Sequence, residues 1–211
     1  FEASDDVSRA EFRTFVAALR LEERYPGIQG VGFARMIAPA ELAGHVKSVR
    51  AEGFPEYTVR PPGERDTYSA IVYLEPFDWR NQRAFGFDMW SEPTRREAMA
   101  RARESGKPAL SGKVTLVQET DKDMQAGTLV YVPIYRKPSG SSNPAASREL
   151  MGWAYSPLRM KQLMTSILER DNPELSRRVV VAVYDGQVAP SPLLFANGDP
   201  AAADPSGFAQ T

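Results

Sequence analysis

Hydrophobic residues recur every three to four positions in four stretches of the chain, and this spacing predicts four helices. The first follows Ser8 and Glu11, which form a capping box, and ends before Tyr25-Pro26-Gly27. The second covers 39–52. The third runs from an N-cap at Ser91 to Gly106, and the fourth opens at Ser156-Pro157. The predicted inner faces are Phe12, Phe15, Val16 and Leu19; Leu42, Val46 and Val49; Ala98, Met99 and Ala102; and Met160, Leu163, Met164 and Ile167.

Short apolar runs between turn residues predict the strands. These runs are 28–34, 56–60, 68–74, 109–117, 128–135, 150–156 and 178–186. Strands mixed with helices in this order favour an α+β fold, with antiparallel strands and helices against a sheet. The segment 137–147 is rich in Pro, Gly and Ser, so we expect the chain to divide there.

Composition excludes several classes of function. The 26 basic and 27 acidic residues nearly cancel, which argues against a nucleic-acid surface. The chain has no cysteine and one histidine, so thiol catalysis, a disulfide framework and a multi-histidine metal site are excluded. No run approaches the roughly 20 apolar residues of a membrane span. Because the chain opens on Phe1, we expect it to be part of a longer protein with flanking anchors.

One segment carries a family resemblance. The run "GFDMWSEPTRREAMARARESGKPALSGKVTLVQE", with "PGIQGVGFA" before it and "GTLVYVPIYR" after it, resembles the CHASE domain. CHASE domains are extracytoplasmic sensing modules of histidine kinases and nucleotide cyclases, including the plant cytokinin receptors. The resemblance implies a long N-terminal helix and two PAS-like lobes. We therefore expect a stalk helix at 1–27, a larger distal ligand-binding lobe at 28–146 and a smaller proximal lobe at 147–211.

Asp88 is the main candidate ligand-binding residue. It lies in "AFGFDMWS", between Phe87 and Trp90, and an acid among apolar residues needs a partner or a shifted pKa. The resemblance implies that Asp88 contacts nitrogen donors of a ligand. The alternative is that Asp88 only satisfies free N–H groups at a helix start. Trp90 and Glu92 stand where the plant receptors carry Met and Gly, which puts adenine-type ligands in doubt.

Phe87 and Trp90, on either side of Asp88, are candidates for the apolar wall of the same ligand pocket. Four further residues are candidates by resemblance: Tyr68, Ser111, Val117 and Tyr131. Tyr68 offers a ring and a hydroxyl. Tyr131 replaces a threonine of the plant receptors, so we expect a smaller or differently shaped pocket. Ser111, Val117 and Tyr131 each also have an alternative as an ordinary core residue of a strand.

Other polar residues are assigned no special role. We expect His45 to be a partly covered surface histidine, Glu75 and Glu119 to be solvated strand ends, and the basic helix after Ser91 to present a solvated face.

These observations predict a periplasmic or extracellular small-molecule sensor of an inner-membrane receptor, without catalytic residues, metal or cofactor. The expected partners are a small ligand, such as an adenine derivative or another metabolite, and a second copy through the N-terminal helix. The whole protein would carry a kinase or diguanylate cyclase domain. The alternative is a protein-interaction or dimerisation module of the same fold without a pocket.

Overall fold

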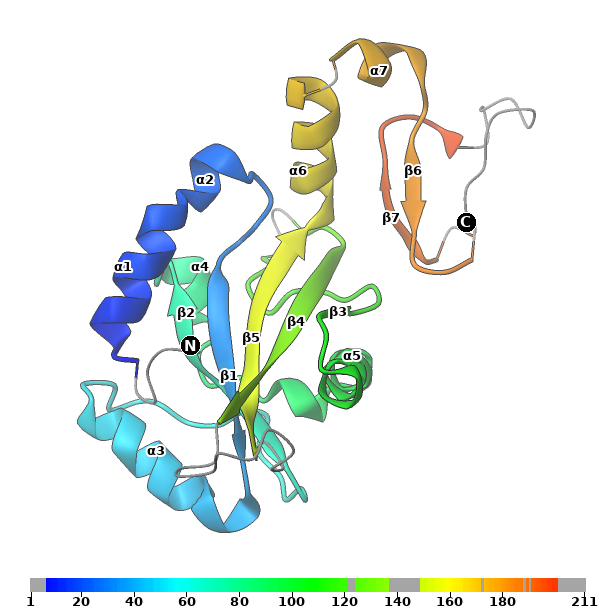
Figure 1. The fold of residues 1–211 in the computed structure, drawn as a ribbon. Coiled ribbons are helices and arrows are strands. Elements are labelled where there is room, and N and C mark those ends of the chain that lie inside the picture. The colour runs from blue at the N-terminus through cyan, green and yellow to red at the C-terminus, as the bar shows by residue number, and fades with distance from the viewer. Residues whose placement is uncertain are drawn as a thin grey trace, which may run out of the picture.

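The computed structural model describes residues 7–120, 124–136, 149–171, 173–187, 189 and 191–200. Its centre is a five-stranded antiparallel sheet with the strand order β2-β1-β5-β4-β3, and a separate hairpin pairs β6 with β7 (Figure 1). The strands are β1 Val31–Ile37, β2 Tyr68–Glu75, β3 Ala109–Leu110, β4 Gly127–Arg136, β5 Glu149–Arg159, β6 Ala182–Tyr184 and β7 Leu193–Ala196.

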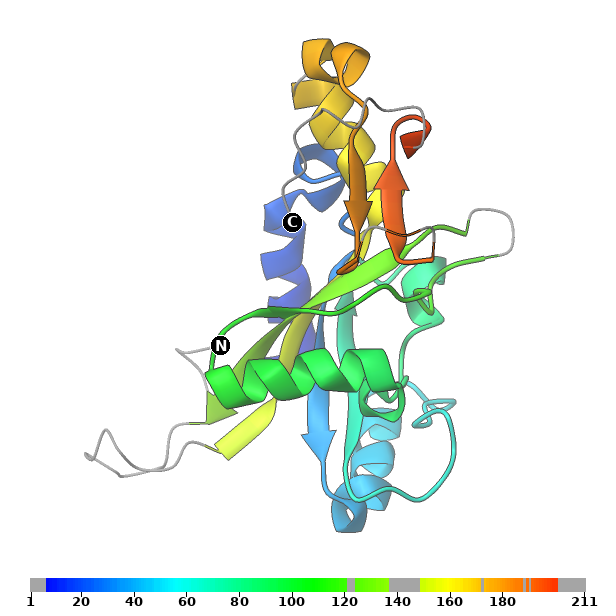
Figure 2. The same ribbon diagram turned by 90° about the vertical axis from the view of Figure 1, so that its right-hand side faces the viewer.

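Helices cover both faces of the sheet. Helix α5 crosses one face (Figure 2), while α1 and α3 lie on the other. The helical elements are α1 Arg9–Leu19, α2 Leu21–Arg24, η1 Pro39–Glu41, α3 Leu42–Ala51, α4 Trp79–Gln82, η2 Met89–Ser91, α5 Pro93–Ser105, α6 Met160–Thr165, η3 Ser166–Asp171 and α7 Pro173–Arg178. The mixed α+β class predicted from the sequence is confirmed.

The predicted start of α1 is confirmed, but its end is not. Ser8 Oγ accepts from the Glu11 amide, and Glu11 Oε2 accepts from the Ser8 amide at 2.8 Å. The helix stops at Leu19 because Arg20 adopts φ 49, a left-handed conformation, and α2 follows. Phe12 is buried against the sheet, with its ring centroid 5.3 Å from that of Tyr73. The apolar side of α1 therefore packs mainly within this chain, although Phe15 is 56% exposed.

Helix α5 packs closely because its inner face is small. Ala98, Met99 and Ala102 are fully buried, as the sequence predicted, and the Trp153 indole donates to the Met99 carbonyl at 3.0 Å. Its N-cap is Glu92 and not the predicted Ser91, because the Glu92 carboxylate accepts from two free amides of the first turn. Gly106 ends the helix at φ 65.

Several predicted elements differ from the observed ones. Residues 56–60 form no strand, only a bridge at Arg60, and 109–117 is a strand only at β3 with a later bridge at Val114. Strand β5 runs through Pro157 to Arg159, so α6 begins at Met160 and not at Ser156-Pro157. Strand β5 follows the expected division between residues 146 and 147, and it is the central strand of the five-stranded sheet, hydrogen-bonded to β1 and β4. The division into two lobes stays a prediction. The loop at 137–147 lies outside the described residues.

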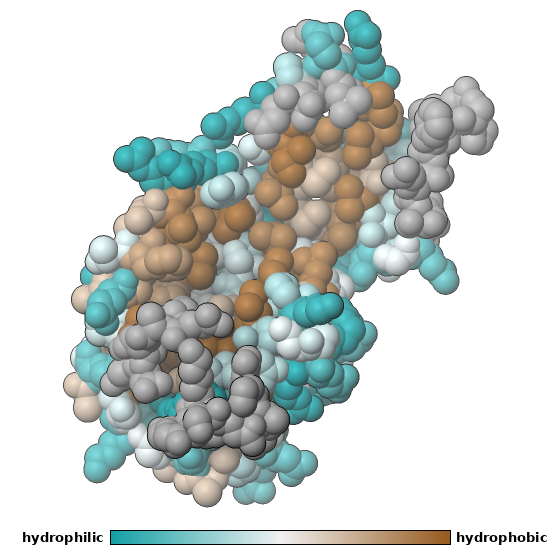
Figure 3. Space-filling model, in the orientation of Figure 1, coloured by the Kyte–Doolittle hydropathy of each residue, from teal (hydrophilic) through white to brown (hydrophobic). Residues whose placement is uncertain are grey.

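Beyond β5, the chain continues into α6 and the hairpin, which stand apart from the main sheet (Figure 1). Apolar residues gather on the surface between α6 and the hairpin (Figure 3). Leu168 and Phe195 are buried there, whereas Ile167, predicted to face inward, is 40% exposed.

Candidate functional site

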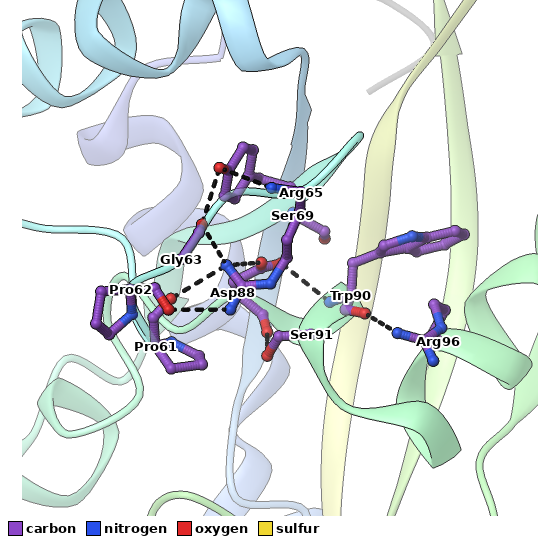
Figure 4. Close-up of polar contacts among 10 residues, drawn as sticks. Pro61, Pro62, Gly63, Arg65, Ser69, Asp88, Trp90, Ser91 and Arg96 are labelled. Carbon is purple, nitrogen blue, oxygen red and sulfur yellow. Dashed lines mark hydrogen bonds and ion pairs between the residues drawn. The ribbon is translucent and has the colours of Figure 1, made fainter.

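Asp88 is fully buried at the outer edge of β2, immediately before η2. Its Oδ1 accepts hydrogen bonds from the Ser69 amide at 2.8 Å and from the Trp90 amide at 3.1 Å (Figure 4). Its own amide donates to the Arg60 carbonyl at 2.6 Å. Oδ1 therefore caps η2 and holds β2. This is the role that the alternative reading of Asp88, as a residue that satisfies free N–H groups at a helix start, predicts.

The other carboxylate oxygen of Asp88 is different. Oδ2 is buried without a hydrogen-bond partner, and Arg65 Nη1 lies 3.5 Å away as its counter-ion. Burial raises the pKa of Asp88, although the Ser69 amide and the Arg65 charge act in the opposite direction. The Ser69 hydroxyl is also buried without a partner. Two buried polar oxygens are thus available for hydrogen bonds, on two residues that the Ser69 amide already joins.

The turn after Arg60 lies over this acid and positions Arg65. The Arg65 guanidinium donates to the carbonyls of Pro61, Pro62 and Gly63 at 3.2, 3.4 and 3.1 Å (Figure 4). Tyr68 holds the same turn, because its hydroxyl donates to the Gly63 carbonyl at 3.0 Å and accepts from the Arg65 amide. Arg65 therefore links Tyr68 to the Asp88 carboxylate.

A second group of unpartnered oxygens lies between the sheet and α5. The hydroxyls of Tyr131 on β4 and Tyr155 on β5 are buried without hydrogen-bond partners, and their ring centroids are 6.4 Å apart. Burial raises the pKa of both hydroxyls well above the ordinary tyrosine value, against a smaller opposing effect of Arg95. Arg95 is itself buried, and it bonds Glu92 at 3.1 Å and the Thr115 carbonyl at 2.8 Å.

Aromatic rings form the wall of this region. Trp90 stacks on Trp153 with centroids 5.5 Å apart, and the Arg95 guanidinium lies 5.3 Å from the centroid of Phe87. Phe87, Trp90 and Val117 pack against the core cluster that contains Tyr131 and Tyr155. The large rings fill much of the space beneath α5.

The candidate residues thus fall into three places. Asp88 and Tyr68 meet at Arg65, whereas Phe87, Trp90, Val117 and Tyr131 surround the core under α5. The Ser111 hydroxyl is used structurally: it donates to the Gly112 carbonyl at 2.8 Å and accepts from the Leu129 amide at 2.9 Å. Sequence reasoning missed Arg65, Ser69, Arg95 and Tyr155. Only Ser69 and Tyr155 had a signal, since both lie in predicted strands, 68–74 and 150–156.

The two carboxylates at predicted strand ends are paired, so the expectation that both are solvated is wrong. Glu119 is buried against Arg159, with oxygen–nitrogen distances of 2.8 and 3.3 Å. Glu75 accepts from Arg13 at 3.2 Å and from the Phe77 amide at 3.0 Å. Arg95 likewise departs from the solvated face expected of α5. Over the described parts of the chain, no cluster of three acidic or histidine side chains could hold a metal ion.

The family comparison covers most of the chain. The family model of the CHASE domain matches residues 5–195, which includes both groups of unpartnered oxygens. No curated protein matches the chain. In the segments that the structure describes, no helix has the length and apolar character needed to cross a membrane. By the extent of the family match, this chain belongs to the CHASE family, whose members are extracytoplasmic sensory domains of signalling receptors.

Proposed function

We propose that this protein binds a small molecule in the part built on the five-stranded sheet, which we call the sheet domain. The ligand would lie between Asp88, at the start of η2, and the core under α5. The observation that carries the proposal is the set of buried oxygens without hydrogen-bond partners: Ser69 Oγ, Asp88 Oδ2, Tyr131 OH and Tyr155 OH. A buried polar group without a partner costs about 1–3 kcal/mol, so several in one domain favour a missing ligand or water. All four lie on β2, β4, β5 or the segment before η2.

The chemistry of these groups describes the ligand. Asp88 Oδ2 accepts hydrogen bonds, so the ligand donates from nitrogen or hydroxyl groups. The rings of Phe87 and Trp90 favour a flat apolar body. Adenine-type molecules fit this description, as do other planar amines and aromatic metabolites. Because Trp90 and Tyr131 are large, we expect the bound molecule to be small.

Signal relay through the C-terminal side of the domain extends the proposal. Strand β5 carries Tyr155 and continues directly into α6, so a ligand that shifts the tyrosine pair moves the start of that helix. We propose that the sheet domain is the distal PAS-like lobe and that α6, α7 and the hairpin belong to the proximal one. In the whole receptor, held in the inner membrane with this domain in the periplasm, the relay would reach a kinase or diguanylate cyclase.

We further propose a homodimer through α1. Phe12 is buried in its own chain, so the contact would centre on Phe15, which is 56% exposed. Analytical ultracentrifugation of the wild type and of Phe15→Ser tests this proposal. Concentration-dependent dimers lost in the variant support it, and a wild type that stays monomeric at high concentration contradicts it.

A second candidate function is a protein-interaction module without a ligand pocket. The Trp90–Trp153 stack and the fully buried Tyr131 favour it, because they fill the space under α5. This alternative leaves the four unpartnered oxygens unexplained.

A thermal-shift screen distinguishes the two functions. The panel contains adenine derivatives, indoles, amino acids and small organic acids. A ligand at a hundred times its dissociation constant adds about 2.7 kcal/mol, which moves the midpoint by several degrees. Asp88→Asn removes the charge at the site, and Asp66→Asn, at an exposed position of the adjoining turn, is the control. A shift lost only in Asp88→Asn supports ligand binding at this site. If both variants keep the shift, the ligand binds elsewhere on the domain. If none of the compounds produces a shift, the interaction module is favoured.

A further inference from the structure

A second polar cleft lies away from the Asp88 region. It has a volume of about 840 Å³ and is bounded by the turn after α2, by α4 and by the start of α6. Arg170 of η3, which continues α6 (Figure 1), donates to the carbonyl of Glu23 in α2 at 2.7 Å. None of the ligand-binding residues predicted from the sequence lines this cleft.

Trp79 supplies a flat apolar surface at the cleft. It is the first residue of α4 and is 61% exposed, whereas Trp153 is fully buried and Trp90 packs on the core. The Arg80 guanidinium lies over the Trp79 ring, 5.0 Å from its centroid, which orients the indole. A large indole left exposed beside a cavity is typical of a recognition surface.

Polar groups with unused hydrogen-bonding capacity line the same cleft as the indole. Asp78 Oδ1 accepts from the Asn81 amide at 2.8 Å, while its second oxygen has no hydrogen bond among the described residues. Gln125 Oε1 accepts from the Gln162 amide at 3.2 Å, and the structure shows no partner for the Gln125 side-chain amide in the described ranges. Lys161 also lines the cleft, without an ion pair in the described part of the chain. The cleft therefore offers acceptors and donors together.

The charges of the cleft nearly cancel. Two acidic residues, Asp78 and Glu22, and two basic residues, Arg80 and Lys161, line it. The charge of Arg159, which also lines it, is already balanced by the buried Glu119. A strongly charged ligand would leave some of these groups unbalanced. A neutral ligand with many hydroxyl groups and one apolar face matches both the balance of charge and the exposed indole.

We propose that this cleft binds a neutral saccharide. The C–H face of one sugar ring lies on the Trp79 indole, whose face carries partial negative charge. The sugar hydroxyls donate to Asp78 and accept from the Gln125 amide and Lys161, since a hydroxyl does both. Because Asp78 and Trp79 belong to the sheet domain and Lys161 belongs to α6, a bound sugar links the sheet to the helix that leaves it. This inference does not depend on the ligand proposed for the Asp88 region.

Saturation-transfer NMR and intrinsic tryptophan fluorescence test the proposal. The probes are glucose, galactose, N-acetylglucosamine and maltose, with adenosine and benzoate as non-sugar comparisons. We expect at least one sugar to bind and to change the fluorescence. Trp79→Ala weakens that binding by about tenfold or more, and Asp78→Asn, which keeps a capping side chain, weakens it less. Phe15→Ala, another exposed aromatic outside the cleft, leaves the binding unchanged, as does Asp88→Asn.

Four results would overturn the proposal. The first is that no sugar in the panel binds the wild type. The second is that a sugar binds Trp79→Ala as tightly as the wild type. The third is that adenosine or benzoate binds at Trp79 while the sugars do not. A sugar that loses its affinity in Asp88→Asn but not in Trp79→Ala belongs to the Asp88 region and also overturns it.

Discussion

Glu119 and Arg159 form a buried ion pair at the point where the sheet passes into α6. Both side chains are nearly inaccessible, at 2% and 4% exposure, and two nitrogen–oxygen contacts of 2.8 and 3.3 Å join them. Arg159 also donates to the Gln162 side chain at 2.9 Å. Glu119 follows Val117 by two residues, and Arg159 directly precedes Met160. The pair therefore connects a segment beside the core under α5 to the helix that leaves the sheet.

Removing one charge of this ion pair is expected to lower the stability of the fold strongly. Glu119→Gln leaves the Arg159 charge buried without its counter-ion, so we expect the free energy of unfolding to fall by about 3–5 kcal/mol. The double variant Glu119→Leu with Arg159→Met removes both charges and recovers much of that loss. Urea denaturation measures each value. Glu97→Gln, in the exposed pair with Arg101, is the control and changes stability by no more than about 0.5 kcal/mol. Equal effects of Glu119→Gln and Glu97→Gln would contradict the assignment.

Removing a buried hydroxyl that has no hydrogen-bond partner is expected not to lower the free energy of unfolding. In the absence of ligand, Tyr155→Phe leaves the free energy of unfolding unchanged or raises it by about 1 kcal/mol, because the buried oxygen no longer lacks a hydrogen bond. Tyr135→Phe is the comparison, since its hydroxyl donates to the Arg103 carbonyl at 2.8 Å, and its loss costs about 0.5–1 kcal/mol. Thermal denaturation of the three proteins measures the difference. A loss above about 1 kcal/mol in Tyr155→Phe would show that the hydroxyl has a partner.

His45 makes stability depend on pH on the acid side. Burial, together with the charges of Arg35 and Arg9, lowers its pKa from 6.5 to about 4, and its Nε2 lies 2.9 Å from the Tyr57 hydroxyl. Between these values the unfolded chain takes up a proton that the folded chain does not. Stability is therefore complete above about pH 6.5 and falls as the pH drops toward 4. The expectation of a partly covered histidine is confirmed, since the residue is half-buried.

The His45→Gln variant tests this dependence. Between about pH 7 and pH 5 we expect the wild type to lose about 1 kcal/mol more than the variant, after allowance for solvent screening. Urea titrations at the two pH values measure the difference. Parallel losses in the two proteins would mean that His45 keeps its ordinary pKa in the folded state.

Two glycines are expected to respond to alanine in opposite directions. Gly152 on β5 has φ 151, and an added Cβ would overlap the Ala34 carbonyl oxygen of β1. Gly152→Ala should therefore lower the unfolding free energy by about 3 kcal/mol. Gly44 lies inside α3 with open space around it, so Gly44→Ala should raise stability by about 0.5–1 kcal/mol. Chemical denaturation of both variants is the measurement. Similar effects at the two positions would contradict the close approach of β5 to β1.

Local chemistry decided the features that the sequence predicted correctly. The capping box of Ser8 and Glu11, the small face of α5 and the left-handed end at Gly106 all depend on residues within a few positions of one another. The predictions that were wrong fall where contacts between distant residues determine the local structure. Strand β5 continues through Pro157, where a helix start was predicted, because β4 on one side and the turn at Gly27–Gln29 on the other hold its backbone.

The sequence by itself determined the family and the α+β class, because each rests on a contiguous motif or a short period. Only the tertiary structure decided that Arg65 faces Asp88 Oδ2, that Tyr131 and Tyr155 share a buried region, and that Glu119 meets Arg159. Residues joined across 23, 24 and 40 positions leave no local pattern, since their proximity depends on strand order and turn geometry. A charged side chain looks the same in sequence whether it is solvated or buried with a partner, and only packing distinguishes the two.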